Sequence, residues 1–354
     1  MSKMREEILQ QPGALDKTLR LELRNVERLK KLMDARPPRM IVLVARGTSD
    51  NAATFGRYLL EITTGIPVSL AAPSIFTLYG SGFRFEDALV VAISQSGEST
   101  DTNLVLQKAR EAGALTVGIT NEPESTLAKL ADHCFLVRAG REKSVAATKT
   151  YTGQLMMLYL LAYALGAKLK LDDLRRLPEW AAQALKLEPE IRERAERYCF
   201  MRHGVVVGRG LNYANAYEFA LKLMETCYVV AERFSSADFL HGPIAMVESA
   251  FPVFLFAPGG VTWPSIKEMR EKLLGLKADT LLITDRSNRE AMTADPGRVI
   301  IVPAKLSSKG PLPADVFTPI PYVIPAQLLA ASLAKEKGLN PDQPRTLSKV
   351  TQTL

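Results

Sequence analysis

The segment Ser94-Gln-Ser-Gly-Glu-Ser99 has the residue types that bind a phosphate group. It follows an apolar run and precedes a helical pattern, and the first turn of a helix offers free N–H groups to an anion. Its hydroxyls add donors, and Gly97 allows the backbone to approach a ligand closely. The segment is neither a GxxxxGK[ST] loop nor a GxGxxG fingerprint, which argues against a nucleotide site. We predict a site for the phosphate monoester of a small molecule; the alternative is an ordinary serine-rich helix cap.

A second group, Glu218, Lys222 and Glu225, has the residue types that proton transfer requires. Spacings of four and seven residues place the three side chains along one stripe of a helix. The alternative is a surface ion pair, which contributes little to stability. The flanking Ala, Leu, Met and Phe residues argue against it, because they indicate a mostly buried helix. Downstream, His241 precedes a Gly-Pro turn that could hold it as a proton donor. Such a set could open a sugar ring and move a proton between adjacent carbons.

Repeated strand and helix patterns are expected to position both groups. The apolar runs 40–45, 88–93 and 115–119 are typical of short strands buried on both faces. Each of the first two is followed by a loop and a helical pattern. This alternation predicts a parallel sheet with helices on both faces.

The second half of the chain repeats this organisation. Three segments recur at offsets of 163, 163 and 164 residues: 42–47 as 205–210, 90–97 as 253–260, and 114–120 as 278–284. Three matches in order indicate an internal duplication, whereas chance similarity between buried strands is the alternative. We therefore expect the following division: a helical lead-in (1–34), a phosphate-binding domain (35–165), a helical connector (166–194), a domain with the acid–base residues (195–330) and a C-terminal tail over the site (331–354).

Composition narrows the class of protein. The chain has 354 residues, 47% of them hydrophobic and 23% charged, which suits a globular protein of two domains. The net charge of +7 comes from Lys and Arg interspersed with Asp and Glu, which argues against nucleic-acid binding.

The spacing of the three cysteines and the length of the apolar segments indicate which cofactors and which cellular location to expect. Cys134, Cys199 and Cys227 are far apart and form no CxxC motif, so neither a zinc site nor a disulfide framework is predicted. The N-terminus lacks the apolar core of a secretory signal, and the longest apolar run, 155–165, is too short to span a bilayer. We expect a cytoplasmic protein with no membrane partner and no metal or organic cofactor.

Six motifs in order resemble the sugar isomerase (SIS) domain pair of glucosamine-6-phosphate synthase. They are Ala45-Arg-Gly-Thr-Ser49, Ser94-Gln-Ser-Gly-Glu-Ser99, Ser144-Val-Ala-Ala-Thr-Lys149, Glu218-xxx-Lys222-xx-Glu225, His241-Gly-Pro243 and Asp342-Gln-Pro-Arg345 to Lys349. The resemblance implies an α/β fold of two tandem SIS domains, each a flavodoxin-like parallel sheet flanked by helices. It covers nearly all of residues 40–354.

The resemblance also suggests an activity. The synthase carries an N-terminal glutaminase domain, for which this sequence leaves no room, so the chain is most similar to stand-alone, SIS-type glucosamine-6-phosphate deaminases. The expected reaction converts glucosamine 6-phosphate to fructose 6-phosphate and ammonia. The enzymatic alternatives are a deaminase or deglycase of another amino-sugar phosphate and ammonia-dependent synthesis with a separate glutaminase. The non-enzymatic alternative is a phosphosugar sensor.

By the same resemblance, Glu225 is the acid–base group, Lys222 acts beside it, and His241 opens the ring of a substrate held by the neighbouring subunit of a homodimer. Lys349 would close over the sugar and form a Schiff base with the ketose. The implied substrate-binding set is Arg46, Gly47, Thr48, Ser49, Ser94, Gln95, Ser96, Ser99, Val145 and Ala147. Two of these depart from the synthase, which has cysteine at the position of Arg46 and serine at that of Ala147.

Overall fold

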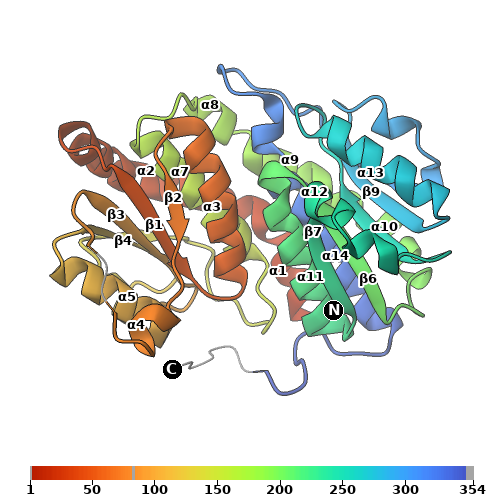
Figure 1. Cartoon of the computed structure of the whole chain (residues 1–354), viewed down its shortest axis with the longest axis horizontal. Coiled ribbons are helices and arrows are strands. Elements are labelled where there is room, and N and C mark those ends of the chain that lie inside the picture. The colour runs from red at the N-terminus through yellow and green to blue at the C-terminus, as the bar shows by residue number, and fades with distance from the viewer. Residues whose placement is uncertain (1, 82–83, 348–354) are drawn as a thin grey trace. The chain divides into compact units, whose positions relative to one another are not determined.

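A computed structural model describes residues 2–81 and 84–347 (Figure 1). The chain forms two compact units. The N-terminal unit consists mainly of residues 13–142 and 147–175, and the C-terminal unit consists of the residues up to Pro12, residues 143–146 and residues 176–345. Each unit is built around its own parallel sheet of five strands.

The sheet of the N-terminal unit has the strand order β2-β1-β3-β4-β5. Its strands are β1 (Met40–Ala45), β2 (Val68–Leu70), β3 (Ala88–Ile93), β4 (Leu115–Thr120) and β5 (His133–Leu136). Its helices are α2 (Gln11–Ala35), α3 (Thr48–Thr64), α4 (Ser74–Thr77), α5 (Thr100–Glu111), α6 (Thr126–Leu130), α7 (Lys149–Ala164) and α8 (Leu171–Leu174). Helices α3 and α7 pack together on one face, whereas α4, α5 and α6 pack together on the other (Figure 1). Burial of the sheet on both faces explains why β1 and β3 are continuous apolar runs.

The sheet of the C-terminal unit has the order β10-β9-β8-β6-β7. Its strands are β6 (His203–Gly208), β7 (Val230–Ser235), β8 (Pro252–Phe256), β9 (Asp279–Asp285) and β10 (Val299–Val302). Its α-helices are α1 (Lys3–Leu9), α9 (Leu177–Leu185), α10 (Glu188–Glu196), α11 (Tyr213–Cys227), α12 (Ser236–Leu240), α13 (Trp263–Gly275) and α14 (Pro319–Glu336). Its 3-10 turns are η1 (Gly210–Asn212), η2 (Pro243–Met246), η3 (Ala291–Thr293), η4 (Pro296–Arg298) and η5 (Ala314–Phe317).

The two sheets share one topology and one register. Numbered within its own unit, each has the order 2-1-3-4-5, which is the flavodoxin-like order. Val42 pairs with Val90 in the first sheet, and the residues 163 positions later, Val205 and Val253, pair in the second. The segments that match in sequence therefore occupy equivalent positions in the two units, and the predicted α/β fold with two tandem domains of parallel sheet is confirmed.

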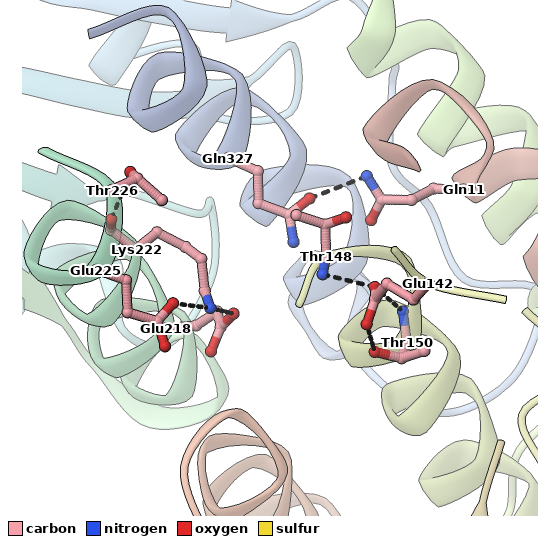
Figure 2. Close-up of polar contacts among 9 residues, drawn as sticks. All are labelled: Gln11, Glu142, Thr148, Thr150, Glu218, Lys222, Glu225, Thr226 and Gln327. Carbon is pink, nitrogen blue, oxygen red and sulfur yellow. Dashed lines mark hydrogen bonds and ion pairs between the residues drawn. The ribbon is translucent and has the colours of Figure 1, made fainter. Parts of the chain in front are cut away.

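The apolar run 155–165 lies mainly in α7, a helix whose side chains are almost all buried. Its counterpart in the C-terminal unit is α14, which is equally buried and packs against α1, α9, α10 and α11. On this helix Gln327 accepts a hydrogen bond of 2.9 Å from Gln11 (Figure 2). None of the helices in the described part of the chain combines the length and the apolar character that crossing a bilayer requires.

Three findings concern the segments outside the sheets. Helix α1, in the predicted lead-in, packs with the C-terminal unit. Helices α8, α9 and most of α10 lie in the predicted connector, 166–194. Helix α14 continues to Glu336, so the first residues of the segment 331–354 are helical.

Candidate active site

The predicted phosphate loop, residues 94–99, lies at the topological switch point of the first sheet. Strand β1 connects to β2 on one side, and the strands from β3 onward are added on the other. In open α/β sheets, ligands bind in the crevice outside the carboxyl ends of the strands at this point. The last residues of β1 and β3, Ala45 and Ile93, are register partners. The segments that begin with Arg46 and Ser94 therefore leave the sheet side by side.

Local hydrogen bonds set the shape of the phosphate loop. The Ser94 Oγ accepts a bond of 3.1 Å from the Gly97 N–H, and the Ser96 Oγ accepts one of 3.3 Å from the Glu98 N–H. The Gly97 carbonyl in turn accepts a bond of 3.0 Å from the Asn103 amide group. These bonds coil the loop over the first turn of α5, so its hydroxyls and amide groups gather at that end of the helix.

Gly97 is required by the backbone and by its neighbours. Its φ of +68° is in the left-handed region. A Cβ at this position would overlap the Oγ and Cβ of Ser125, which caps α6. The glycine therefore permits both the turn and the close packing of the loop.

The first turn of α5 is a candidate site for an anion. The N-cap residue, Ser99, makes no capping bond to this helix in the described structure, and its hydroxyl lies 3.0 Å from that of Thr102. Helices usually satisfy their first N–H groups with such a cap. A phosphate group placed here would take that role.

The segment after β1 contributes the predicted residues 46–49. Arg46 donates two hydrogen bonds to Asp101, and Gly47 has a φ of +57°. Thr48 begins α3, while the buried Ser49 hydroxyl accepts a bond of 2.9 Å from Gln154. These four residues share one edge of the sheet with Ser94, Gln95, Ser96 and Ser99, so the structure brings together all the predicted ligands of the N-terminal unit except Ala147.

The equivalent edge of the second sheet is built differently. The residues after β8 are Ala257-Pro-Gly-Gly260, which carry no hydroxyl. A Cβ on Gly260 would lie 2.8 Å from the Asp315 Oδ2, so a carboxylate of the protein already occupies this turn. Burial raises the pKa of Asp315. Of the two equivalent loops, the one after β3 carries the hydroxyl groups, and the one after β8 does not.

Glu142 organises the start of α7 within the N-terminal unit (Figure 2). Its buried carboxylate accepts bonds of 2.9 Å and 3.2 Å from the N–H groups of Thr148 and Thr150, and one of 2.7 Å from the Thr150 hydroxyl. A carboxylate at a helix N-terminus is favoured by the helix dipole. Glu142 was not predicted from the sequence, because a glutamate between Arg141 and Lys143 resembles surface charge; its place before the 144–149 motif was the available signal.

The motif 144–149 itself is shared between the two units. Ala147 is partly buried and belongs to the N-terminal unit, whereas the partly buried Val145 belongs to the C-terminal unit. In that unit the carboxylate of Glu7, on α1, accepts hydrogen bonds from the N–H groups of Lys143 and Ser144, the second at 3.1 Å. Glu7 therefore holds the segment that carries Val145, a role that was not predicted from the sequence.

The acid–base cluster, Glu218, Lys222 and Glu225, lies on α11 of the C-terminal unit (Figure 2). The Lys222 Nζ lies 2.6 Å from the Glu225 Oε2 and 3.4 Å from the Glu218 Oε1. The side chains of Lys222 and Glu218 are 1% and 0% exposed, but that of Glu225 is 20% exposed. Glu225 is thus the carboxylate of this cluster that a ligand can reach, and a buried lysine holds it in place.

The position of α11 follows from the turn after β6. Gly208 packs so closely on Asn212 that a Cβ there would overlap the Asn212 carbonyl. The Asn212 side chain donates a bond of 2.7 Å to Thr318, which fixes this turn to the start of α14. Near the other end of α11, Cys227 contacts the Ala330 carbonyl, and burial raises the pKa of its thiol to about 11.

Of the other two predicted catalytic residues, one is on a different element of the C-terminal unit and one is outside the described residues. His241 is exposed and follows α12, with its N–H bonded to the Asp238 carbonyl at 3.1 Å. Lys349 lies outside the described residues. Within the described ranges, no group of three or more His, Cys, Asp or Glu residues is arranged to hold a metal ion.

Two features define the class of the protein. A hydroxyl-rich loop follows β3 in the first flavodoxin-like sheet, and the helix with the Glu–Lys–Glu cluster follows β6 in the second. The chain belongs to the SIS domain family, which it matches over residues 36–164 and 201–308.

Relatives of known name agree with this assignment. The isomerising glutamine–fructose-6-phosphate aminotransferase of Aquifex aeolicus is 36% identical over 365 residues, which cover 98% of this chain and 57% of that protein. The corresponding enzyme of Pyrococcus horikoshii is 34% identical over 352 residues, again with 98% and 57% coverage. The chain therefore spans little more than half the length of these relatives.

Solved structures extend the comparison. The C-terminal domain of glucosamine-fructose-6-phosphate aminotransferase from Francisella tularensis superimposes with a TM-score of 0.86 at 29% identity, over 97% of this chain and 98% of that one. Glucosamine-6-phosphate deaminase from Thermotoga maritima has the same fold, with a TM-score of 0.74 at 23% identity over 99% of this chain and 100% of that one.

Proposed function

We propose that this chain is an aldose–ketose isomerase of an amino-sugar phosphate that converts glucosamine 6-phosphate to fructose 6-phosphate and ammonia. The observation that carries the proposal is the placement of Lys222 between two carboxylates on a buried helix. A surface ion pair needs no such burial, whereas a general base must be held within reach of the proton it moves. The names of the relatives, which act on fructose 6-phosphate or glucosamine 6-phosphate, support this choice of substrate.

The proposed mechanism assigns one task to each group. His241 protonates the ring oxygen and opens the pyranose. Glu225 removes the proton from C2 of the open-chain 2-amino aldose and returns it to C1, while a second proton moves from the C2 amino group to O1. The product is the C2 imine of fructose 6-phosphate. Lys222 orients Glu225 and offsets its charge. Water then adds to the imine, and ammonia leaves.

The remaining residues bind the substrate. The phosphate loop holds the phosphate group through Ser94, Gln95, Ser96 and Ser99, and residues 46–49 flank it. Val145 and Ala147 contact the sugar, and Lys349 closes over it. In the reverse direction, with fructose 6-phosphate as substrate, the Lys349 amine forms a Schiff base with the ketone at C2 and water leaves. We further propose that the active form is a homodimer in which His241 serves the site of the neighbouring subunit. The exposure of His241 supports this arrangement, because a residue shared across an interface must reach the surface of its own chain.

The test is release of ammonia and fructose 6-phosphate from glucosamine 6-phosphate by the purified protein, without glutamine. Equal amounts of both products, at a steady rate proportional to enzyme, are expected. Glu225→Gln should lower kcat by about 10²–10⁴-fold, the usual value of a positioned general base. The matched control is Glu268→Gln, which removes a carboxylate that pairs with Lys272 on the exposed face of α13. Full activity of Glu225→Gln would refute the mechanism.

Synthesis is the second candidate, because the relatives from Aquifex aeolicus and Pyrococcus horikoshii are named as aminotransferases of fructose 6-phosphate. Incubation of fructose 6-phosphate with ammonium, followed by detection of glucosamine 6-phosphate, tests that direction with the same variants. Binding of both sugars without turnover in either direction would instead indicate a phosphosugar sensor.

The shared site has its own test. Glu225→Gln and His241→Ala should each be inactive alone, but mixed dimers contain one site with neither substitution. An equal mixture is therefore expected to recover up to about a quarter of the wild-type rate, and absence of recovery after subunit exchange would contradict the dimer proposal.

A further inference from the structure

Arg46 is a cation held beside the phosphate loop. Its Nε and Nη2 donate to the same oxygen of Asp101, at 3.0 Å and 2.6 Å. Asp101 lies in the first turn of α5, the helix whose N-terminus the loop precedes. The guanidinium is therefore fixed within one helical turn of the N–H groups that an anion would contact.

The sheet register places Arg46 beside Ser94 at the same edge of the sheet. Ala45 and Ile93 pair at the ends of β1 and β3, so Arg46 and Ser94 follow directly on adjacent strands. Adjacent strands lie about 4.8 Å apart. A phosphate group over the loop is thus bordered by α5 on one side and by the segment after β1 on the other.

The charges explain why an arginine is needed there. Asp101 is 1% exposed and carries a carboxylate close to the proposed anion site, which would repel a phosphate dianion. Arg46 neutralises that carboxylate and is held in a fixed orientation by it. The bonds to Asp101 use two of the five guanidinium N–H groups of Arg46, whose side chain is 49% exposed. The remaining N–H groups can therefore donate to a ligand while the bonds to Asp101 stay intact.

We propose that Arg46, oriented by Asp101, binds the phosphate group of the substrate and makes the site selective for phosphorylated sugars. Arg46 is then a substrate-binding residue, and Asp101 is a positioning residue that acts through it. The identity of the sugar rests on the proposed function, but the recognition of a phosphate monoester by Arg46 does not. Arginine suits this task, because its planar donors match the geometry of phosphate oxygens.

The experiment measures binding by calorimetry, so that it does not depend on turnover. The probes are inorganic phosphate, glucosamine 6-phosphate and unphosphorylated glucosamine, with the full chain at two salt concentrations. Arg46→Ala should weaken binding of both phosphate probes by about 10- to 100-fold, as expected for loss of a hydrogen bond between charged groups. Affinity for glucosamine should change little. The control is Arg57→Ala, which removes a half-exposed arginine from α3 of the same unit.

A second variant tests the link between Arg46 and Asp101. In Arg46→Ala the buried carboxylate is left facing the phosphate, so the double variant with Asp101→Asn should bind phosphate more tightly than Arg46→Ala alone. If the ion pair is purely structural, Asp101→Asn should restore stability in the Arg46→Ala background by removing an unpaired buried charge, but it should not tighten phosphate binding. Arg46→Lys keeps the charge and should retain part of the affinity, and thermal unfolding shows whether each variant is folded.

Each result separates this inference from the proposed function. Phosphate binding that depends on Arg46 without any turnover would support the role of Arg46 and contradict the proposed reaction. Turnover by a folded Arg46→Ala variant, with unchanged affinity for the phosphate probes, would support the proposed reaction and contradict the role of Arg46. A wild-type protein that binds neither phosphate probe would overturn the role of Arg46.

Discussion

Replacement of Gly97 by alanine separates two physical costs in the phosphate loop. The first is backbone strain, because a residue with a Cβ pays about 1–2 kcal/mol at a φ of +68°. The second is overlap of the new Cβ with Ser125, for which over-packing in a tight site costs about 1–3 kcal/mol. The expected loss of unfolding free energy is therefore about 2–5 kcal/mol. Because the loop must move to relieve the overlap, affinity for inorganic phosphate should fall as well.

The matched control is Gly65→Ala. Gly65 has a similar φ of +72°, but a Cβ added there would meet no other atom within 4 Å. This variant should lose only the strain of about 1–2 kcal/mol and keep its phosphate affinity. Adding Ser125→Gly to Gly97→Ala removes both overlapping atoms, at a capping cost of a few tenths of a kcal/mol, and should recover most of the second cost. Urea titration of the full chain gives the free energies, and equal losses for Gly97→Ala and Gly65→Ala would refute the reasoning.

Three further predictions concern buried groups. Lys222→Met leaves two carboxylates on α11 without their cation and should destabilise the protein by about 3–5 kcal/mol in urea titrations; a loss below about 1 kcal/mol would mean that the cluster is hydrated. Glu142→Ala removes three hydrogen bonds from the start of α7 and should raise KM and lower stability by about 2–4 kcal/mol. Glu142→Gln keeps the volume and one acceptor oxygen and should recover part of both; equal effects of the two substitutions would contradict this and show that the charged carboxylate is required. Burial raises the pKa of Cys227 to about 11, so about one thiol in a thousand is ionised at pH 8. The exposed Cys199 should therefore react with a thiol reagent first, and the rate of labelling at Cys227 should rise about tenfold per pH unit. Fast labelling of Cys227 at pH 8 would contradict its burial.

The sequence by itself determined the fold and its duplication. Continuous apolar runs such as 40–45 and 88–93 cannot face water on either side, so they predict buried parallel strands. Because the same spacing recurs 163 residues later, one domain predicts the topology of the other, and the registers Val42–Val90 and Val205–Val253 agree with it. The helical stripe that carries Lys222 was also predictable, since residues four positions apart lie on one face of a helix whatever surrounds it.

Tertiary structure alone decided which charges are buried and which partners they meet. Arg46 and Asp101 are 55 positions apart, and their contact depends on the pairing of β1 with β3. Glu142 and Glu7 resemble surface glutamates in the sequence, because local patterns do not report whether a carboxylate will find backbone N–H groups to bind. Side-chain charge is a property of the residue, but its energetic role depends on burial and on neighbours brought together by long-range packing.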